Sequence, residues 1–164
     1  MAASCPLAGL SSTIVAIALG SNLGDRTAHL AHGFDRLASV LADLRRSSPR
    51  ETAPQGVEAQ PPFLNAAAVG VTRLQPRALL DTLLAIESER GRTRARLGLP
   101  RTLDLDLILY GQDVIDEPGL QVPHPRFRER LFVLEPLAEL AADWTDPVTG
   151  KTVQQLLQEV RSEK

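Results

Sequence analysis

Asp104 and Asp106 stand two residues apart in a run of leucines formed by Leu103, Leu105 and Leu107. In a β-strand this spacing places both carboxylates on one face. Residues two apart on a strand are about 6 to 7 Å from each other, so the carboxylates could bridge two divalent ions about 3.5 to 4 Å apart. Hard oxygen ligands favour magnesium. The alternative is a pair of ordinary surface aspartates, but the leucines indicate a strand in a packed sheet and favour the metal site.

Arginines gather just before these aspartates, at Arg90, Arg92, Arg94, Arg96 and Arg101. Two neighbouring carboxylates repel unless a cation compensates, and the arginine fork binds phosphate through two parallel hydrogen bonds. Gly91 and Gly98 flank this segment and would let a loop close over a nucleotide. A solvated basic loop explains the same residues equally well.

Three further sites could contact a ligand. His124 lies between Pro123 and Pro125, which restrict its backbone, although residue types alone leave its role open. Asn65, near the aromatic Phe63, could pair with a flat heterocycle. The glycine-rich segment 20–24 resembles a phosphate-binding turn but lacks the Lys-Ser/Thr pair of a P-loop, so a tight structural turn is the better interpretation.

Length and charge bound the class of protein. A chain of 164 residues suits one compact domain, and we expect a tail over residues 1–12 and a single domain over residues 13–164. The net charge of −2 gives no global attraction to nucleic acid or to an anionic membrane surface. No segment approaches the roughly 20 apolar residues that span a bilayer. Cys5 is the single cysteine, so no internal disulfide can form. We expect a cytoplasmic monomer.

The elements that must position these residues follow from periodicity and turn chemistry. Residues 13–18 predict a buried strand that runs into Gly20, and Asp25 is a candidate N-cap for a helix with an apolar stripe through residue 41. Residues 45–51 predict an edge strand, and residues 52–62 a proline-rich loop. Residues 63–71 predict another strand, after which Pro76 begins a helix that Gly91 ends.

The second half of the chain continues this pattern. A polar loop over residues 91–101 precedes a strand over residues 102–110, which ends in a turn at Gly111. Residues 127–142 predict a helix in two pieces divided near Pro136. Thr152 and Gln155 have capping-box spacing for a last helix. Helices between hairpin-like strands indicate an α+β domain with a largely antiparallel sheet.

Five segments in this order resemble the 6-hydroxymethyl-7,8-dihydropterin pyrophosphokinase family of folate biosynthesis, and the likeness covers nearly the whole chain. The segments are IALGSNLGD (17–25), FLNAA (63–67), PRTLDLD (100–106), VPHP (122–125) and RLFVLEPL (130–137). The resemblance implies a ferredoxin-like α+β fold. It also implies an ATP-dependent diphosphotransferase with ATP and the pterin as substrates, two magnesium ions as cofactors and AMP as product.

The resemblance assigns roles to individual residues. Asp104 and Asp106 would hold both magnesium ions, with Arg92 and Arg101 beside them in catalysis. The residues expected to contact ATP are Glu87, Arg94, His124 and Arg130. The residues expected to contact the pterin are Thr52, Pro54, Phe63, Asn65 and Phe132.

The chain departs from the family pattern at Gly98 and Leu99, where the family usually has Trp-Gly. Two other functions compete with the pyrophosphokinase. One is a non-catalytic nucleotide-sensing domain of the same fold, which the retained aspartates and Arg92 disfavour. The other is a two-metal nucleotidyl transferase or phosphodiesterase, and Asn65 with its aromatic partners favours the pterin substrate over it.

Overall fold

The computed structural model describes residues 11–52, 62–90 and 102–163. The strands of its main sheet are β1 (Thr13–Ser21), β2 (Ala42–Arg46), β3 (Arg50–Thr52), β4 (Phe63–Thr72) and β5 (Asp104–Tyr110). A small hairpin contains β6 (Ile115–Glu117) and β7 (Leu120–Val122). The helices are α2 (Arg26–Val40), α3 (Pro76–Glu89), the 3-10 turn η2 (Phe127–Glu129), α4 (Leu131–Ala141) and α5 (Val153–Ser162).

The described strands of the main sheet pair in the order β2-β4-β1-β5, and β3 also pairs with β4. Every one of these pairings is antiparallel. The α+β class and the largely antiparallel sheet predicted from the sequence are therefore confirmed.

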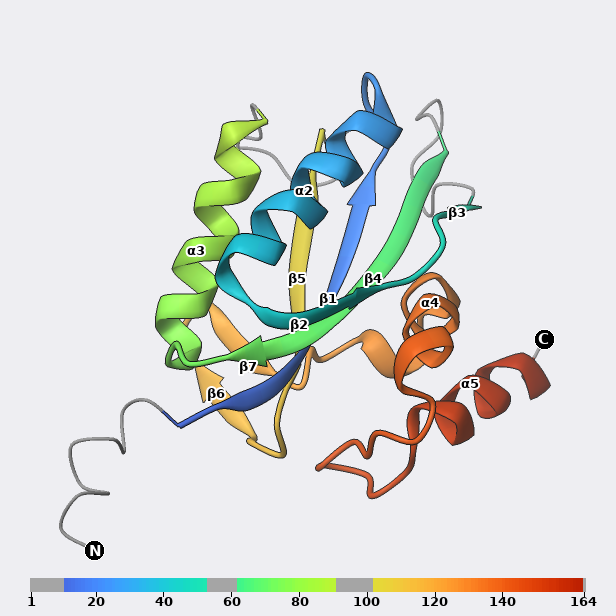
Figure 1. The fold of residues 1–164 in the computed structure, drawn as a ribbon. Coiled ribbons are helices and arrows are strands. Elements are labelled where there is room, and N and C mark those ends of the chain that lie inside the picture. The colour runs from blue at the N-terminus through green and yellow to red at the C-terminus, as the bar shows by residue number, and fades with distance from the viewer. Residues whose placement is uncertain (1–10, 53–61, 91–101, 164) are drawn as a thin grey trace, which may run out of the picture.

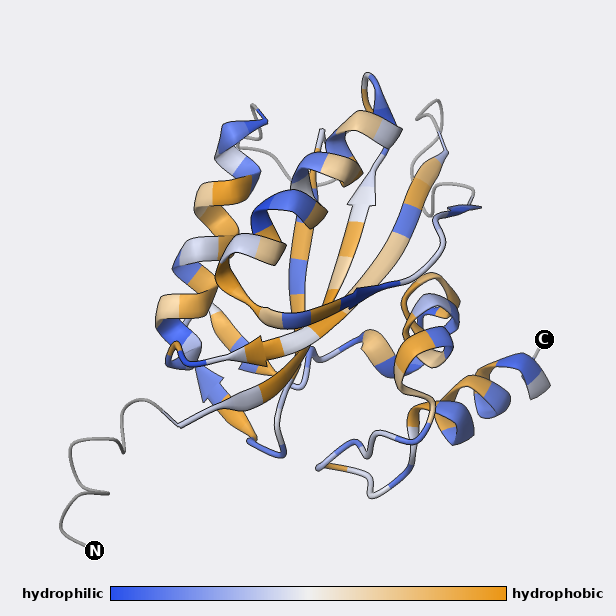
Figure 2. Cartoon of the chain, in the orientation of Figure 1, coloured by the Kyte–Doolittle hydropathy of each residue, from blue (hydrophilic) through white to orange (hydrophobic). Residues whose placement is uncertain are grey.

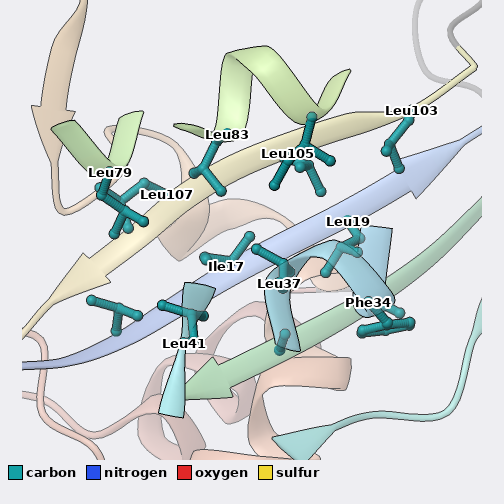
Figure 3. Packing of buried hydrophobic residues seen from close by; sticks show 14 of the residues in the cluster. Ile17, Leu19, Phe34, Leu37, Leu41, Leu79, Leu83, Leu103, Leu105 and Leu107 are labelled. Carbon is teal, nitrogen blue, oxygen red and sulfur yellow. The ribbon is translucent and has the colours of Figure 1, made fainter. Parts of the chain in front are cut away.

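Helices cover both faces of this sheet (Figure 1). On one face α2 and α3 pack against the odd-numbered residues of β1, and Figure 3 shows Ile17 and Leu19 between Leu83 and Leu37. On the other face α4 and α5 pack against a second apolar cluster that includes Ala16, Val69, Leu134 and Leu157. Because side chains alternate along each strand, the sheet contributes residues to two separate hydrophobic cores, one on each face.

Helix starts agree with the predicted signals. The Asp25 side chain accepts a hydrogen bond from the Ala28 amide at 3.1 Å, as expected for an N-cap. Pro76 opens α3, where a missing N–H costs nothing. Thr152 and Gln155 form a complete capping box at α5.

The predicted edge strand over residues 45–51 is partly wrong, because the chain divides it into β2 and β3. Arg46 pairs with Ala68 and Arg50 pairs with Asn65, so three residues, 47–49, face only two on β4. Pro49 has no N–H for the ladder, and the Ser47 hydroxyl accepts from the Ala67 amide at 2.8 Å instead. The segment therefore bulges between two short strands.

The predicted helix division at Pro136 is wrong. The break lies at Arg130, between η2 and α4, and Pro136 stands inside α4. A proline there removes one backbone hydrogen bond, but Leu134 and Leu137 bury their side chains on both sides of it. Packing against the sheet holds the helix together through the proline.

The β6–β7 hairpin lies beside the lower end of β5 and turns at Gly119, where φ is +75°. The sequence prediction reached only as far as a turn after Gly111. None of the helices in the described residues has the length and apolar character needed to cross a bilayer.

Candidate active site

Asp104 and Asp106 project from the α4 side of β5. Leu105 and Leu107 pack into the core under α3, with Leu105 only 2% exposed (Figure 3). Because side chains alternate along a strand, the two aspartates point to the opposite face, where both are partly exposed. The predicted placement of both carboxylates on one face of a packed strand is confirmed.

Small residues border these carboxylates on the neighbouring strand. Asp104 pairs with Gly20 and Asp106 pairs with Ala18 in the register of β1 and β5. Paired residues of an antiparallel sheet share a face. The strand positions beside the two carboxylates therefore carry no side chain or only a methyl group.

Two basic residues from the segment after β7, His124 and Arg130, reach this acidic position. Burial lowers the pKa of the Arg130 guanidinium, and nearby Arg126 lowers it further, whereas Asp106 and Asp104 act in the opposite direction. Burial also lowers the pKa of His124, as does Arg130, while Asp104 opposes the shift. The fold thus brings Arg130 close enough to interact electrostatically with both aspartates, and His124 close enough to interact with Asp104.

Backbone hydrogen bonds fix the position of His124. Its amide donates to the Ile108 carbonyl at 3.0 Å, two residues beyond Asp106 on β5. Its Nδ1 accepts from the Arg126 amide at 3.2 Å. Since Nδ1 is the acceptor, the neutral ring carries its proton on Nε2 and can donate it to an anion.

Arg130 also connects the acidic position with an aromatic ring. Its guanidinium carbon lies 5.4 Å from the centroid of the Phe132 ring, a cation–π arrangement in the first turn of α4. Phe132 is therefore presented on the same side of the sheet as the two aspartates.

Asn65 lies in the same row of the sheet as Asp104. Gly20 pairs with Asp104 on one side and with Asn65 on the other. Two strand spacings separate the outer residues, a distance of about 10 Å. Asn65 is 5% exposed, and its Nδ2 donates to the Thr52 hydroxyl at 2.7 Å.

Gly20 lies in the middle of this row, where a side chain would crowd its neighbours. A Cβ at this position would stand 3.2 Å from Asn65 Oδ1 and 3.6 Å from the Phe63 ring. The sequence interpretation placed Gly20 in a tight turn, but it lies inside β1, and it is Gly24 that has a positive φ, +74°. Its missing side chain makes room beside Asn65 and Phe63.

The resulting surface has two chemically different ends. The acidic end is formed by Asp104 and Asp106 with His124 and Arg130 nearby. The amide end is formed by Asn65, which Thr52 orients, and the ring of Phe63, which pairs in register with Thr52. A ligand with a polyphosphate and a flat polar ring would match both ends.

The donor set at the acidic end fits magnesium. Two carboxylates from one strand leave most of an octahedral shell to waters and phosphate oxygens, which is how proteins usually bind this ion. Within the described part of the chain no group of three or more His, Cys, Asp or Glu residues could by itself hold a metal. Such an incomplete set suits an ion that arrives with a phosphate ligand.

Glu87 belongs to α3, on the other side of the sheet. It is 1% exposed, and its Oε2 accepts a hydrogen bond from the Leu105 amide at 2.7 Å. This carboxylate therefore holds the outer edge of β5 directly between the two aspartates. Its expected contact with ATP stays a prediction.

Four predicted site residues lie outside the described residues, namely Pro54, Arg92, Arg94 and Arg101. Sequence reasoning also missed Gly20 as part of the site and the contact of Thr52 with the Asn65 side chain. It missed the buried hydroxyls of Ser21 and Thr102, which have no hydrogen-bond partner within the described structure. A glycine inside a strand is the one local signal that could have indicated Gly20.

Comparison with known proteins agrees with this geometry. Residues 16–142 match the family model described as 7,8-dihydro-6-hydroxymethylpterin-pyrophosphokinase. A 2-amino-4-hydroxy-6-hydroxymethyldihydropteridine pyrophosphokinase of Synechocystis is 41% identical over 145 residues, covering 88% of this chain and 74% of the relative. One of the same name from Bacillus subtilis is 46% identical over 131 residues, covering 79% of this chain and 78% of the relative.

Among solved structures, wild-type Plasmodium falciparum HPPK-DHPS has a TM-score of 0.75 at 13% identity. The alignment covers 93% of this chain but only 45% of the Plasmodium chain, so the present chain spans less than half of that protein. This likeness concerns the fold, and it bears out the ferredoxin-like architecture expected from the sequence.

Proposed function

The chain belongs to the 7,8-dihydro-6-hydroxymethylpterin-pyrophosphokinase family, and from that membership we propose how its residues carry out the reaction. The enzyme transfers pyrophosphate from ATP to 6-hydroxymethyl-7,8-dihydropterin and leaves AMP. The observation that carries the assignment of residues is the row Asp104, Gly20 and Asn65, which puts a carboxylate and an amide about 10 Å apart on one face.

Asp104 and Asp106 are the proposed ligands of two magnesium ions. Bound there, magnesium would neutralise charge on the triphosphate and align it for in-line displacement. The strand fixes the spacing of the two carboxylates, and the Leu105 amide bound to Glu87 holds that strand from its outer edge.

His124 and Arg130 are the proposed phosphate contacts among the described residues. His124 offers its Nε2–H and Arg130 its guanidinium, both beside the aspartates. From the sequence we also propose Arg92 and Arg101 in catalysis, with Arg94 and Glu87 as nucleotide contacts. The arginine guanidinium groups would stabilise negative charge that spreads over the transferred group.

Asn65 is the proposed recognition group for the pterin. One Nδ2–H is engaged by Thr52, so the other N–H and the Oδ1 atom can pair with the polar edge of the heterocycle. Phe63 and Phe132 would flank the ring, and Pro54 is proposed as a further neighbour.

The reaction then needs positioning more than new covalent chemistry. The hydroxymethyl oxygen attacks the β-phosphorus, and the bond from that phosphorus to the α-β bridging oxygen breaks, so that AMP leaves. The hydroxyl proton passes to solvent or to one of the two carboxylates. Holding the substrates at both ends of one row would convert an encounter of two molecules into a single oriented complex.

Release of AMP from ATP, with and without the hydroxymethyl-dihydropterin, tests this function. We expect AMP only when both the pterin and magnesium are present. Release of pyrophosphate instead of its transfer would indicate the nucleotidyl transferase chemistry, and ATP binding without turnover would indicate a nucleotide sensor.

Three expectations about the whole chain are likewise proposals. We propose a single domain over residues 13–164 that acts as a monomer in the cytoplasm. Light scattering of the purified protein measures the oligomeric state, and a mass near twice that of the 17.8 kDa chain would contradict it.

A further inference from the structure

Strand β3 contains only three residues and pairs only with β4 among the described strands. Its register places Arg50 opposite Asn65 and Thr52 opposite Phe63. The Thr52 hydroxyl reaches Asn65 only in this register, because a slip by one residue would turn Thr52 to the other face of the sheet. So short a ladder specifies register weakly by its backbone, and something else must fix it.

On the α2 side of the sheet, β3 is held by Arg26. The Arg26 guanidinium lies 2.6 Å from Glu51 Oε1 and also donates to the Pro62 carbonyl at 2.9 Å. Glu51 follows Arg50 in the strand, and Pro62 directly precedes β4. One side chain at the start of α2 thus contacts β3, which carries Thr52, and the residue that leads into β4, which carries Asn65.

On the α4 side, β3 is held by glutamates. Arg50 Nη2 donates to Glu139 Oε1 at 3.3 Å, and Nη1 lies 4.0 Å from Glu135. Glu139 also accepts from the Ser48 amide at 3.1 Å and from its hydroxyl at 3.3 Å. Figure 2 shows β3 as a hydrophilic piece beside the apolar part of β4.

The order of charges therefore matches the two faces. A cation at position 50 meets anions on α4, and an anion at position 51 meets a cation on α2. In a register slipped by one residue, Glu51 would face Glu135 and Glu139, and Arg50 would face Arg26. Like charges brought together across elements destabilise a pairing.

We propose that the charges of Arg50 and Glu51 fix the register of β3, because Glu139 pairs with Arg50 on one face of the sheet and Arg26 pairs with Glu51 on the other. This register lock holds Thr52 against Asn65. Arg26 and Glu139 are therefore positioning residues for pterin binding. This inference rests on the proposed pterin contact of Asn65. It assigns a binding role to side chains that touch neither substrate.

Exchanging the two charges within the strand is the sharpest test. The double variant Arg50→Glu/Glu51→Arg keeps composition and net charge. In the native register it places like charges against Glu139 of α4 and against Arg26 of α2. We expect its KM for the pterin to rise about tenfold or more, with the KM for ATP within twofold. A pterin KM within twofold of wild type would overturn the lock.

Reversing one cross-element pair adds a rescue. Arg26→Glu and Glu51→Arg should each raise the pterin KM about fivefold, the scale of a lost exposed pair. The double variant Arg26→Glu/Glu51→Arg restores opposite charges and should recover at least half of that change on a logarithmic scale. Effects that simply multiply in the double variant would overturn the proposal.

Two controls separate this outcome from general damage and from a wrong function. Arg77→Glu breaks a similarly exposed ion pair with Glu117 at 3.0 Å, outside the row that carries Asn65, and should leave the pterin KM unchanged. An equal rise in the pterin and ATP KM values of the exchange variant would overturn the lock. If wild-type protein itself released no AMP in response to the pterin, the proposed function would fail instead.

Discussion

The two carboxylates of β5 stand in a setting that a single residue could not provide. Each is flanked by core leucines, faces a glycine or an alanine on β1, and lies near His124 or Arg130. Packing of the leucines on one face of β5 therefore fixes the strand, and the carboxylates on the other face lie close to basic side chains.

Replacing either Asp104 or Asp106 by alanine should lower turnover by about a hundredfold or more, because one carboxylate alone could not hold the two magnesium ions that we propose. The free energy of unfolding without magnesium should change by less than about 1 kcal/mol, since partly exposed side chains contribute little. AMP release and urea unfolding measure the two quantities.

Asp113→Ala is the matched control for this prediction, because Asp113 is exposed and lies three residues beyond the end of β5. It should keep full turnover. Turnover within tenfold of wild type in the Asp104 or Asp106 variant would contradict the metal assignment.

Asn65 and Thr52 allow a graded prediction. Asn65→Ala removes the amide that we propose contacts the pterin, and should weaken pterin affinity more than tenfold while nucleotide binding alone stays intact. Thr52→Val keeps the shape of the side chain but removes the acceptor of the 2.7 Å bond, so the amide loses its orientation and affinity should fall about threefold to tenfold.

Calorimetry with a non-hydrolysable ATP analogue, followed by the pterin, measures both affinities in each variant. Equal losses for nucleotide and pterin would show that these substitutions disturb the fold rather than one contact.

At the scale of elements, the outer edge of β5 depends on α3. The Leu105 amide points away from β1 to the buried Glu87 carboxylate, so a helix side chain completes the ladder of an edge strand. Because this bond lies between Asp104 and Asp106 along the backbone, the position of α3 bears directly on the spacing of the carboxylates.

Glu87→Ala should lower the free energy of unfolding by about 1 to 3 kcal/mol, because the buried Leu105 amide loses its acceptor. Glu87→Gln keeps an acceptor oxygen and should retain more of the stability. Chemical denaturation of both variants, with wild type alongside, measures the difference.

Kinetics of the glutamine variant address the expected ATP contact. If Glu87 also contacts the nucleotide, the KM of the Glu87→Gln variant for ATP should rise severalfold while its stability is largely kept. An unchanged KM for ATP would restrict Glu87 to holding β5.

At the scale of the whole molecule, an ion pair between a partly exposed arginine and a buried aspartate joins η2 to the segment after α4. Asp146 is fully buried, and Arg128 Nη2 donates to its Oδ1 at 3.0 Å. The Thr149 hydroxyl and the Val148 amide also donate to this carboxylate, at 2.7 and 3.1 Å. Burial raises the pKa of Asp146, but these hydrogen bonds outweigh it and hold the pKa below its usual value.

Asp146→Asn should destabilise the fold at pH 7 by about 2 to 4 kcal/mol, because Arg128 keeps a charge without its partner. Since the folded-state pKa lies below the unfolded value of about 3.9, the carboxylate contributes its full stability above about pH 5. That contribution is lost as the pH falls through the folded-state pKa.

The difference in unfolding free energy between wild type and the asparagine variant should therefore shrink between pH 5 and pH 2. Urea titrations across that range measure it. A difference that stays constant with pH would show that the loss comes from packing and not from the charge of Asp146.

Local sequence determined the elements that carry the chemistry. The alternation of Asp104 and Asp106 with leucines predicted their strand and its two faces, and the signals at Asp25, Pro76 and Thr152 predicted where helices begin. These features depend on residues within one or two turns of each other, where backbone geometry leaves few choices. The order of the motifs along the chain likewise indicated the family.

Tertiary structure alone decided which distant residues meet. The register of three strands puts Gly20 between Asp104 and Asn65. Packing against the sheet allows α4 to continue past Pro136 without a break. The bulge after β2 and the contacts of Arg26 and Glu139 with β3 were likewise decided by tertiary structure. No local pattern contains this information, because strand register and helix packing are set by side chains far apart in the chain, whose contacts exist only once the sheet has formed.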